Sequence, residues 1–485
     1  MLYECLKNNS KTIPMKKVFI SKSDSLTNLE LYIKVKKILY FFIDNKIINK
    51  KIIIEFHEEI DIIPAFFASI ILGNNICLVD LKRMEKLKIY IESVFLSDIL
   101  IANSKIIFKN QNLTFEQVYS VEEIKDLDHI IIENEKKNRD VLTIFTSGST
   151  GTPKGIIIKK ENINFSICSV ASKLKFTPTD KIGLFLPITF DYGLYHLFFT
   201  IISKCSLEFF SKEYSEFELI SFIEDRKITF LPSLPKTTMN ILWLASKNSK
   251  FNISSLRAIT NTGEYLNPES QKTAWKLNPD LNIYFMYGIT ECKRVSILSP
   301  EEYRIKPTSV GKAIPGTEVF IKEENSEILK KTGYGELIVK GPHIAAGYLE
   351  TSDDNSACSF FMIDNEKFFK TGDLFYIDTF GYLFFEGRKS DFIKHNGFRL
   401  DPYEIEHCIL DLPNIIFTKV ITFDNKVVLI FQGDHPIKEV YSVLKNKLDY
   451  YKIPKILKLE KIPLTKNGKV DIDNIKNSYY KMRSL

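Results

Sequence analysis

The chain has 485 residues with 66 basic and 60 acidic side chains, and its net charge of +6 is too small to indicate nucleic acid as a partner. Hydrophobic residues make up 45% and charged residues 26%, which is typical of a globular protein and excludes a disordered or fibrous one. Because this length exceeds what one hydrophobic core organises, we expect more than one domain.

Cysteine spacing and hydropathy exclude further classes. The seven cysteines are scattered and form no Cys-x-x-Cys, so neither a disulfide framework nor a zinc site is indicated. The N-terminus has lysines where a secretory signal would be apolar. The stretch from Ile53 to Ile76 contains acidic residues and falls short of the roughly 20 apolar residues of a membrane span. We expect a soluble, cytoplasmic protein with no membrane partner, a monomer or a homodimer.

The first 145 residues predict alternating helices and strands. Thr27 and Glu30 have the spacing of a capping box, and the apolar residues that follow predict a helix to about Asn45. A second helix is expected from Pro64 to Leu72. Strand-like runs lie at residues 51–55, 76–79, 98–102 and 141–145, whereas the charged segment 133–139 is expected to be a surface connection. This alternation predicts an α/β domain.

A ten-residue loop follows the last of these strands: Thr146-Ser147-Gly148-Ser149-Thr150-Gly151-Thr152-Pro153-Lys154-Gly155. Its glycines allow close approach of a ligand, and its hydroxyl groups, N–H groups and Lys154 suit a polyphosphate. The spacing is neither a P-loop nor Gly-x-Gly-x-x-Gly. A mobile linker is the alternative, but strand-like segments flank the loop on both sides.

Further motifs follow in chain order. From Gly311 onward, short alternating runs separated by glycines predict an antiparallel β subdomain. Taken singly, each motif has an ordinary structural explanation, such as a turn at Thr371-Gly372-Asp373, a hairpin at Asn396-Gly397 or a surface lysine at Lys469. The motifs are Asn261-Thr262-Gly263-Glu264, Tyr287-Gly288-Ile289-Thr290-Glu291, Lys370-Thr371-Gly372-Asp373, Gly387-Arg388, Lys389-Ser390-Asp391-Phe392-Ile393-Lys394, Asn396-Gly397-Phe398-Arg399 and Pro463-Leu464-Thr465-Lys466-Asn467-Gly468-Lys469-Val470-Asp471.

Together with the loop, these motifs resemble, in the same order, those of the adenylate-forming superfamily of acyl-CoA synthetases, adenylation domains and luciferases. The resemblance covers roughly residues 140–475. It implies an α/β fold with a large multi-lobed N-terminal domain, residues 1–388, that includes a β subdomain. A small, mobile α+β C-terminal domain, residues 389–485, would carry the catalytic lysine.

The resemblance also implies binding of ATP and Mg²⁺. Tyr287 would stack on adenine, Thr290 would contact the α-phosphate and Glu291 would hold the metal. Asp373 would accept hydrogen bonds from the ribose hydroxyls, with Arg388 nearby. The implied ATP-binding residues are Thr146, Ser147, Gly148, Ser149, Thr150, Gly151, Lys154, Gly263, Glu264, Tyr287, Gly288, Asp373 and Arg388.

In the C-terminal part, Lys469 matches the family's catalytic lysine, which joins Thr290 and Glu291 as the implied catalytic residues. Ser390 stands where the family's hinge residue is Asp or Lys, and Asp391 lies beside it. The hinge residue is therefore either Ser390 or Asp391. Gly397 belongs to the motif that faces the thiol tunnel. The eight lysines from Lys445 to Lys469 suit an acidic carrier protein, or equally a solvated face.

The acid pocket implied by the resemblance includes the segment 190–196. An aspartate like Asp191 pairs with the substrate ammonium in amino-acid-activating relatives, whereas Arg294 could neutralise Asp191 or hold a second carboxylate. His196 is expected to be a packed residue. The implied pocket residues are Asp191, Tyr192, Tyr195, Phe230, Thr260, Thr262, Met286 and Arg294.

The implied activity is that of an AMP-forming acid–thiol ligase. It would adenylate a small carboxylic acid, preferentially an amino acid, and transfer it to the phosphopantetheine thiol of a carrier protein. An acyl-CoA or aryl-CoA synthetase that uses free CoA is the alternative, and an inactive nucleotide-binding relative is the non-enzymatic one.

Overall fold

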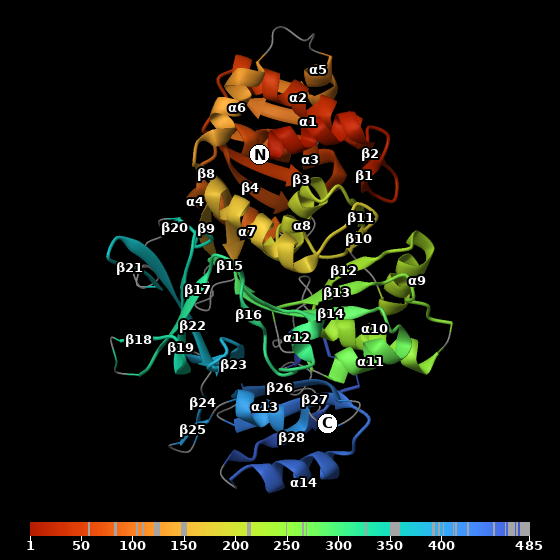
Figure 1. The fold of residues 1–485 in the computed structure, drawn as a ribbon, viewed down its shortest axis with the longest axis vertical. Coiled ribbons are helices and arrows are strands. Elements are labelled where there is room, and N and C mark those ends of the chain that lie inside the picture. Colours follow the sequence, from red (N-terminus) through yellow and green to blue (C-terminus); the bar gives the residue numbers. More distant parts are fainter. Residues whose placement is uncertain are drawn as a thin grey trace.

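The computed structural model describes the chain except for residues 57–58, 82–84, 103–104, 109–110, 121–126, 147–152, 211–214, 249, 264–265, 268, 325, 327, 350–358, 390–392, 396–397, 401, 411, 413–414, 424–425, 450–451, 461, 464–470, 472–473 and 476–485. Two large sheets with parallel strands at their centres, an antiparallel sheet and a terminal α+β unit make up the molecule, and the antiparallel sheet lies beside the nine-stranded sheet (Figure 1).

The first large sheet has its parallel strands in the centre, and the hydrophobic core that it shares with the second sheet lies between strands and helices. Parallel strands require crossover helices, which explains the alternating pattern of the sequence. In spatial order its strands are β16 (Lys312–Ala313), β15 (Cys292–Leu298), β14 (Asn282–Ile289), β13 (Ala258–Asn261), β12 (Phe230–Ser233), β10 (Lys181–Leu184), β11 (Ser206–Phe209), β1 (Lys17–Ile20) and β2 (Ser25–Thr27).

The second sheet contains the strands on both sides of the phosphate loop, β8 and β9, which pair antiparallel near one of its edges. Its order is β20 (Gly347–Tyr348), β9 (Lys154–Lys159), β8 (Asp140–Thr146), β4 (Asn75–Asp80), β3 (Lys51–Phe56), β5 (Ile99–Ala102), β6 (Lys105–Phe108) and β7 (Gln111–Thr114). The helices of the two large lobes are α1 (Leu2–Thr12), α2 (Asn28–Asp44), α3 (Glu59–Leu72), α4 (Glu85–Phe95), α5 (Phe115–Tyr119), α6 (Asp128–Lys136), α7 (Lys160–Leu174), α8 (Asp191–Ile202), α9 (Glu216–Arg226), α10 (Pro235–Lys247), α11 (Glu269–Leu277) and α12 (Pro300–Tyr303).

The helix predicted after Thr27 is confirmed, including its reciprocal capping box with Glu30. Two other predictions were wrong in part. Helix α3 begins at Glu59 and contains Pro64 in its interior, because the buried side chains before the proline stabilise the helix by more than the one missing hydrogen bond costs. The segment 133–139 is not only a surface connection, since α6 extends to Lys136 and buries Ile131 against the core.

The antiparallel β subdomain predicted after Gly311 is confirmed. It contains β19 paired with both β17 and β22, and β23 paired with β22. The strands are β17 (Glu318–Lys322), β18 (Leu329–Lys330), β19 (Gly333–Lys340), β21 (Phe360–Ile363), β22 (Glu366–Ile377) and β23 (Leu383–Arg388).

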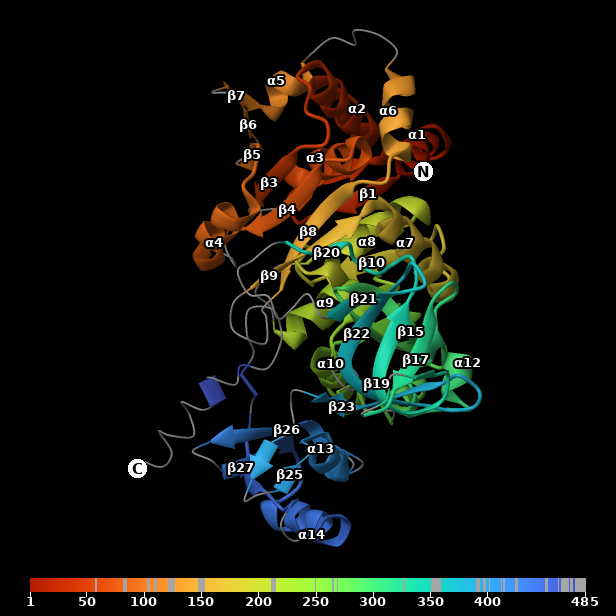
Figure 2. The same cartoon turned by 90° about the vertical axis from the view of Figure 1, so that its left-hand side faces the viewer.

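The C-terminal part lies at the end of the molecule opposite to α1–α6 in both views (Figures 1 and 2), and it has hydrophobic clusters of its own. The hairpin predicted at Asn396-Gly397 is supported by antiparallel pairing on either side of these two residues, although the residues themselves lie outside the described part. The elements are β24 (Ile393–His395), β25 (Phe398–Leu400), α13 (Pro402–Leu410), β26 (Ile415–Phe423), β27 (Lys426–Gly433), α14 (Ile437–Lys447) and β28 (Lys455–Lys458).

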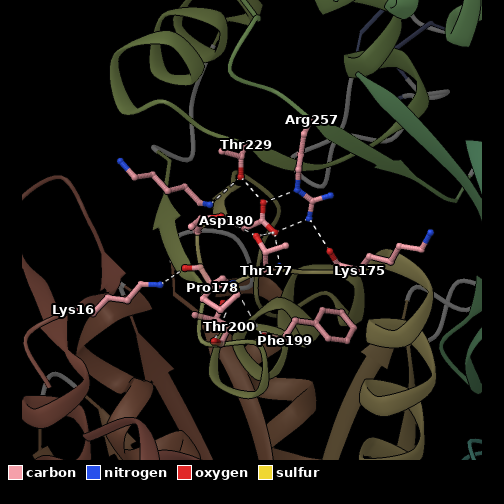
Figure 3. Close-up of polar contacts among 12 residues, drawn as sticks. Lys16, Lys175, Thr177, Pro178, Asp180, Phe199, Thr200, Thr229 and Arg257 are labelled. Atoms are coloured by element: carbon pink, nitrogen blue, oxygen red, sulfur yellow. Dashed lines mark hydrogen bonds and ion pairs between the residues drawn. The ribbon is translucent and has the colours of Figure 1, made fainter. Parts of the chain in front are cut away.

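An ion pair between the buried Asp180 and the half-buried Arg257 connects three strands of the first sheet (Figure 3). Asp180, 2% exposed and just before β10, accepts from Arg257 Nε at 2.6 Å and Arg257 Nη2 at 2.5 Å. Thr229, just before β12, donates to Asp180 Oδ1 at 2.8 Å, and Thr177 N donates to Oδ2 at 2.7 Å. Burial alone would raise the pKa of Asp180, but the hydrogen bonds from Arg257, Thr177 and Thr229 outweigh it and lower this pKa.

We expect Asp180→Asn to lower the free energy of unfolding by about 2 kcal/mol at pH 7, because it removes the charge from these hydrogen bonds. A carboxyl group whose pKa is lower in the folded state stabilises the protein at pH values above the ordinary pKa of that group, about 4. That stability is lost as pH falls through the folded-state pKa. Urea unfolding at several pH values should therefore show the gap between wild type and variant closing in acid. The exposed Asp280→Asn is the control, and an equal gap at all pH values would contradict the assignment.

Candidate functional site

The predicted nucleotide and acid-binding segments meet at the carboxyl ends of β13 and β14. These strands are parallel neighbours, with Asn261 paired to Phe285, so the residues that follow each strand lie at the same edge of the sheet. Such an edge is where α/β sheets bind ligands. Thr262 and Gly263 follow β13 directly. Gly263 has a φ of +96°, which is unfavourable for any residue that carries a side chain.

Thr290 and Glu291 form the two-residue turn between β14 and β15, because Ile289 and Cys292 pair across the hairpin. The Ala345 N–H donates to the Glu291 carbonyl at 2.8 Å and fixes the turn. This short turn places the Thr290 and Glu291 side chains at the tip of the hairpin.

Tyr348 connects this tip to the end of the phosphate loop. Its hydroxyl donates to Glu291 Oε1 at 2.9 Å, and Lys154 Nζ lies 5.6 Å from the centre of its ring. Strand β20, which contains Tyr348, pairs with β9 immediately after Lys154. Tyr348 is not among the sequence candidates, because only this strand pairing brings it to Glu291.

The surroundings of Glu291 fit a magnesium ion. Burial raises the pKa of this carboxyl group, so a nearby cation would favour its ionised form. The Tyr348 hydroxyl donates its hydrogen bond to Oε1 of Glu291, so the carboxylate retains lone pairs that can bind a cation. A hard cation such as Mg²⁺ can bind these lone pairs and phosphate oxygens at the same time. Among the described residues, no three His, Cys, Asp or Glu side chains form a metal cage, so Glu291 would share the ion with a phosphate-bearing ligand.

The structure brings together the three residues predicted for adenine and ribose. Asp373 is buried and accepts from Arg388 Nε at 2.6 Å on Oδ1 and from the Tyr287 hydroxyl at 2.6 Å on Oδ2. The Tyr287 ring packs edge-to-face on Phe375, with 4.6 Å between centroids. Each carboxylate oxygen has a second lone pair, so Asp373 can still accept a ribose hydroxyl.

In the predicted acid pocket, Asp191 is paired with a lysine that the sequence did not indicate. Lys293 Nζ lies 3.0 Å from Asp191 Oδ2, and both side chains are less than 10% exposed. Burial lowers the pKa of Lys293 to about 8, although Asp191 acts in the opposite direction. Asp191 begins helix α8, and Lys293 lies in β15.

Arg294 does not pair with Asp191, and one of the two roles considered for it was therefore wrong. Its Nη1 donates to Thr262 Oγ1 at 2.6 Å, and its guanidinium carbon lies 5.3 Å from the centre of the Tyr192 ring. The Tyr192 hydroxyl in turn bonds Thr260. Arg294 is only 3% exposed, and its burial lowers its pKa. In the described part of the chain, no carboxylate lies within ion-pair distance of it.

A small cavity of about 10 Å³, roughly the space of one water molecule, lies beside these residues. Phe230 is not part of its lining, because it lies at the amino end of β12 and packs on Phe176 and under Arg257. The expectation that His196 is a packed residue is confirmed, since it is buried with its ring against Tyr192 and Phe199, and it also lines the cavity. The lining residues are Val170, Leu174, Tyr192, Tyr195, His196, Phe199, Thr260, Met286, Lys293 and Arg294.

Several predicted residues lie outside the described part of the chain, so their roles stay predictions. They include most of the phosphate loop and the catalytic lysine. They are Ser147, Gly148, Ser149, Thr150, Gly151, Glu264, Ser390, Asp391, Gly397 and Lys469. Thr146 and Lys154 are described and pair with each other across β8 and β9.

Comparison with known proteins identifies the family. Residues 87–349 match the family described as AMP-binding enzyme. A D-alanine–D-alanyl carrier protein ligase from Staphylococcus epidermidis is 30% identical over 393 residues, which cover 76% of this chain and 78% of the relative.

The chain belongs to the AMP-binding enzyme family. The predicted resemblance to the adenylate-forming superfamily is thereby confirmed. A probable CoA ligase from Humulus lupulus is 27% identical over 67% of this chain, and the chain spans 61% and 62% of the length of the first two curated relatives it matches.

The predicted fold class is also confirmed. The O-succinylbenzoate–coenzyme A synthetase of Bacillus subtilis, solved in complex with ATP and a magnesium ion, matches with a TM-score of 0.75 and 22% identity, covering 96% of this chain and 98% of that one. Within the part of the chain that the structure describes, no helix combines the length and apolar composition needed to cross a membrane.

Proposed function

We propose that this AMP-binding enzyme uses ATP to activate a small carboxylic acid as an acyl-adenylate and then transfers the acyl group to a pantetheine thiol. The observation that carries the proposal is the convergence at one sheet edge of a nucleotide cluster and an acid pocket. Asp373, Arg388 and Tyr287 form the first, and Arg294 next to Thr262 belongs to the second.

In the first half-reaction, a carboxylate oxygen of the acid attacks the α-phosphorus of ATP. A new P–O bond forms, the bond to the bridging oxygen of the β-phosphate breaks, and pyrophosphate leaves with the negative charge. The phosphate loop with Lys154 would hold the leaving pyrophosphate, and Thr290 and Lys469 would stabilise charge around the α-phosphate. Glu291 would hold Mg²⁺, which neutralises phosphate charge when bound.

In the second half-reaction, a thiolate attacks the acyl carbonyl and AMP leaves, which gives a thioester. We propose a carrier protein as the thiol donor, because the lysine-rich segment 445–469 suits an acidic partner and the Staphylococcus relative is named for one. Free CoA is the second candidate, because the Humulus relative is a probable CoA ligase. Supplying CoA or a pantetheinylated carrier protein to the preformed adenylate distinguishes the two.

We also propose that residues 389–485 form a separate domain that moves between the half-reactions, with Ser390 or Asp391 as hinge and Gly397 at the thiol tunnel. Support comes from its own hydrophobic clusters, which are separate from the core of the two large sheets. A cytoplasmic location fits the free state of the described cysteines.

An amino acid stays a candidate substrate. The ion pair with Lys293 occupies Asp191 Oδ2, which weakens the expectation that this carboxylate binds a substrate ammonium. The other carboxylate oxygen, Oδ1, has no hydrogen-bond partner among the described residues and could receive one. Exchange of amino acids by an Asp191→Ala variant at the wild-type rate would remove Asp191 from that role.

ATP–pyrophosphate exchange over a panel of acids tests the activity. We expect exchange with at least one acid, and Lys469→Ala should lower it by about 100-fold, because a cation that stabilises developing charge is lost. Lys466→Ala, three residues away in the same motif, is the matched control and should retain exchange. Exchange with no acid would overturn the proposed function, and wild-type exchange by Lys469→Ala would remove that lysine from the mechanism.

A further inference from the structure

Two adjacent cations, Lys293 and Arg294, lie at the acid pocket on the same strand. Successive residues of a regular strand point to opposite faces, so both would not line one cavity. Here the pairing of β14 with β15 is irregular between Tyr287 and Ile289, and Arg294 has a φ of +61°. A bulge re-aims side chains in this way and is common beside active sites. A Cβ at Gly288 would lie 3.0 Å from Arg294 Cα, so any larger residue there would crowd the bulge.

The charges at this cavity do not cancel. Lys293 is neutralised by Asp191 at 3.0 Å, and burial lowers the pKa of His196 to about 3, so His196 adds no charge. Tyr195 is protonated, because burial raises the pKa of its hydroxyl. Arg294 is then a buried cation without a carboxylate partner among the described residues.

The Arg294 guanidinium has five N–H donors, and in the described part of the chain only the Nη1 bond to Thr262 uses one of them. A buried cation without a counterion costs several kcal/mol, which is compensated when an anion binds. A second unpaired atom lines the same cavity. His196 Nδ1 faces the Tyr192 carbonyl at 2.8 Å, whereas the buried Nε2 has no partner. Such unpaired polar atoms at a cavity point to a ligand.

We propose that the acid activated here carries a second anionic group, a carboxylate at the far end of a short chain, and that Arg294 binds it. This inference rests on the proposed function, because it names the substrate class of the same pocket. The planar guanidinium matches a carboxylate with two parallel hydrogen bonds, which neither a methyl group nor an ammonium can replace. The cavity is close to the size of one water molecule, so a short diacid would enter by displacing side chains such as Met286.

Pyrophosphate exchange with size-matched acids tests the proposal, using succinate against butanoate and glutarate against pentanoate. Wild type should exchange the better diacid at least roughly 30-fold faster than its monoacid, because the monoacid leaves Arg294 unpaired. Arg294→Met should lose this preference, and Arg294→Lys should retain part of it. Arg304→Met, which removes an exposed arginine, is the matched control. Equal or better exchange of the monoacids by wild type would overturn the inference and leave the proposed function intact.

Thermal unfolding without ATP gives a second readout that does not depend on activity. Removing an uncompensated buried cation should raise the unfolding temperature of Arg294→Met, whereas loss of a purely structural arginine would lower it. A diacid should raise the unfolding temperature of wild type but not of Arg294→Met. If no acid supports exchange, these shifts in unfolding temperature alone decide whether Arg294 binds the diacid. A diacid that stabilises wild type and Arg294→Met equally, or stabilises neither, contradicts the role of Arg294.

Discussion

Lys293→Met is expected to lower the free energy of unfolding by about 3–5 kcal/mol, the usual cost of breaking a buried ion pair by removing one partner. Asp191 and Lys293 are both less than 10% exposed and lie 3.0 Å apart. Without the lysine, the carboxylate stays buried and must either remain ionised or take up a proton. Urea unfolding at pH 7 measures the loss.

The double variant Asp191→Asn with Lys293→Met separates the ion pair from packing. It removes both charges, so it should recover most of the lost stability. Lys330→Met is the surface control, because its pair with Glu323 is exposed on both sides and should be worth at most about 1 kcal/mol. A double variant as unstable as Lys293→Met would show that the lysine acts through packing instead of through Asp191.

Asp373→Ala is expected to lower kcat/KM for ATP by about 1,000-fold, mainly through KM. The change removes the proposed ribose acceptor and leaves Arg388 and the Tyr287 hydroxyl without their shared carboxylate. A hydrogen bond to a charged group is worth about 1.5–3 kcal/mol, so the loss of two such bonds to the ribose hydroxyls corresponds to an effect of this size. Steady-state pyrophosphate exchange at varied ATP concentration measures it.

Tyr287→Phe is the matched control for this prediction. It keeps the ring that packs on Phe375 and removes one hydrogen bond, so we expect a decrease of about 5-fold to 10-fold. If Asp373→Ala changed KM for ATP no more than Tyr287→Phe, Asp373 would only organise its neighbours and would not contact the nucleotide.

Short-range patterns predicted much of the fold correctly. The capping box at Thr27 and Glu30 places its partners three residues apart, so no distant contact is needed to form it. The β subdomain likewise follows from alternating residues and glycine turns. The prediction failed at α6, where helix formation depends on distant contacts. The Tyr3 hydroxyl donates to Asp128 at 2.6 Å, and the N-terminal amine lies 2.8 Å from Glu135.

Local motifs in the sequence are enough to identify the family and to predict the nucleotide-binding residues in their order, because the backbone and side-chain chemistry of each motif is complete within a few residues. The pairing of the charges in the acid pocket, in contrast, depends on contacts between distant segments. Asp191 and Lys293 are 102 positions apart in the chain, and the irregular pairing of β14 with β15 lets Lys293 reach Asp191 while Arg294 reaches Thr262. A strand of regular period would separate these two side chains onto opposite faces, so their convergence at one cavity could not be predicted from spacing.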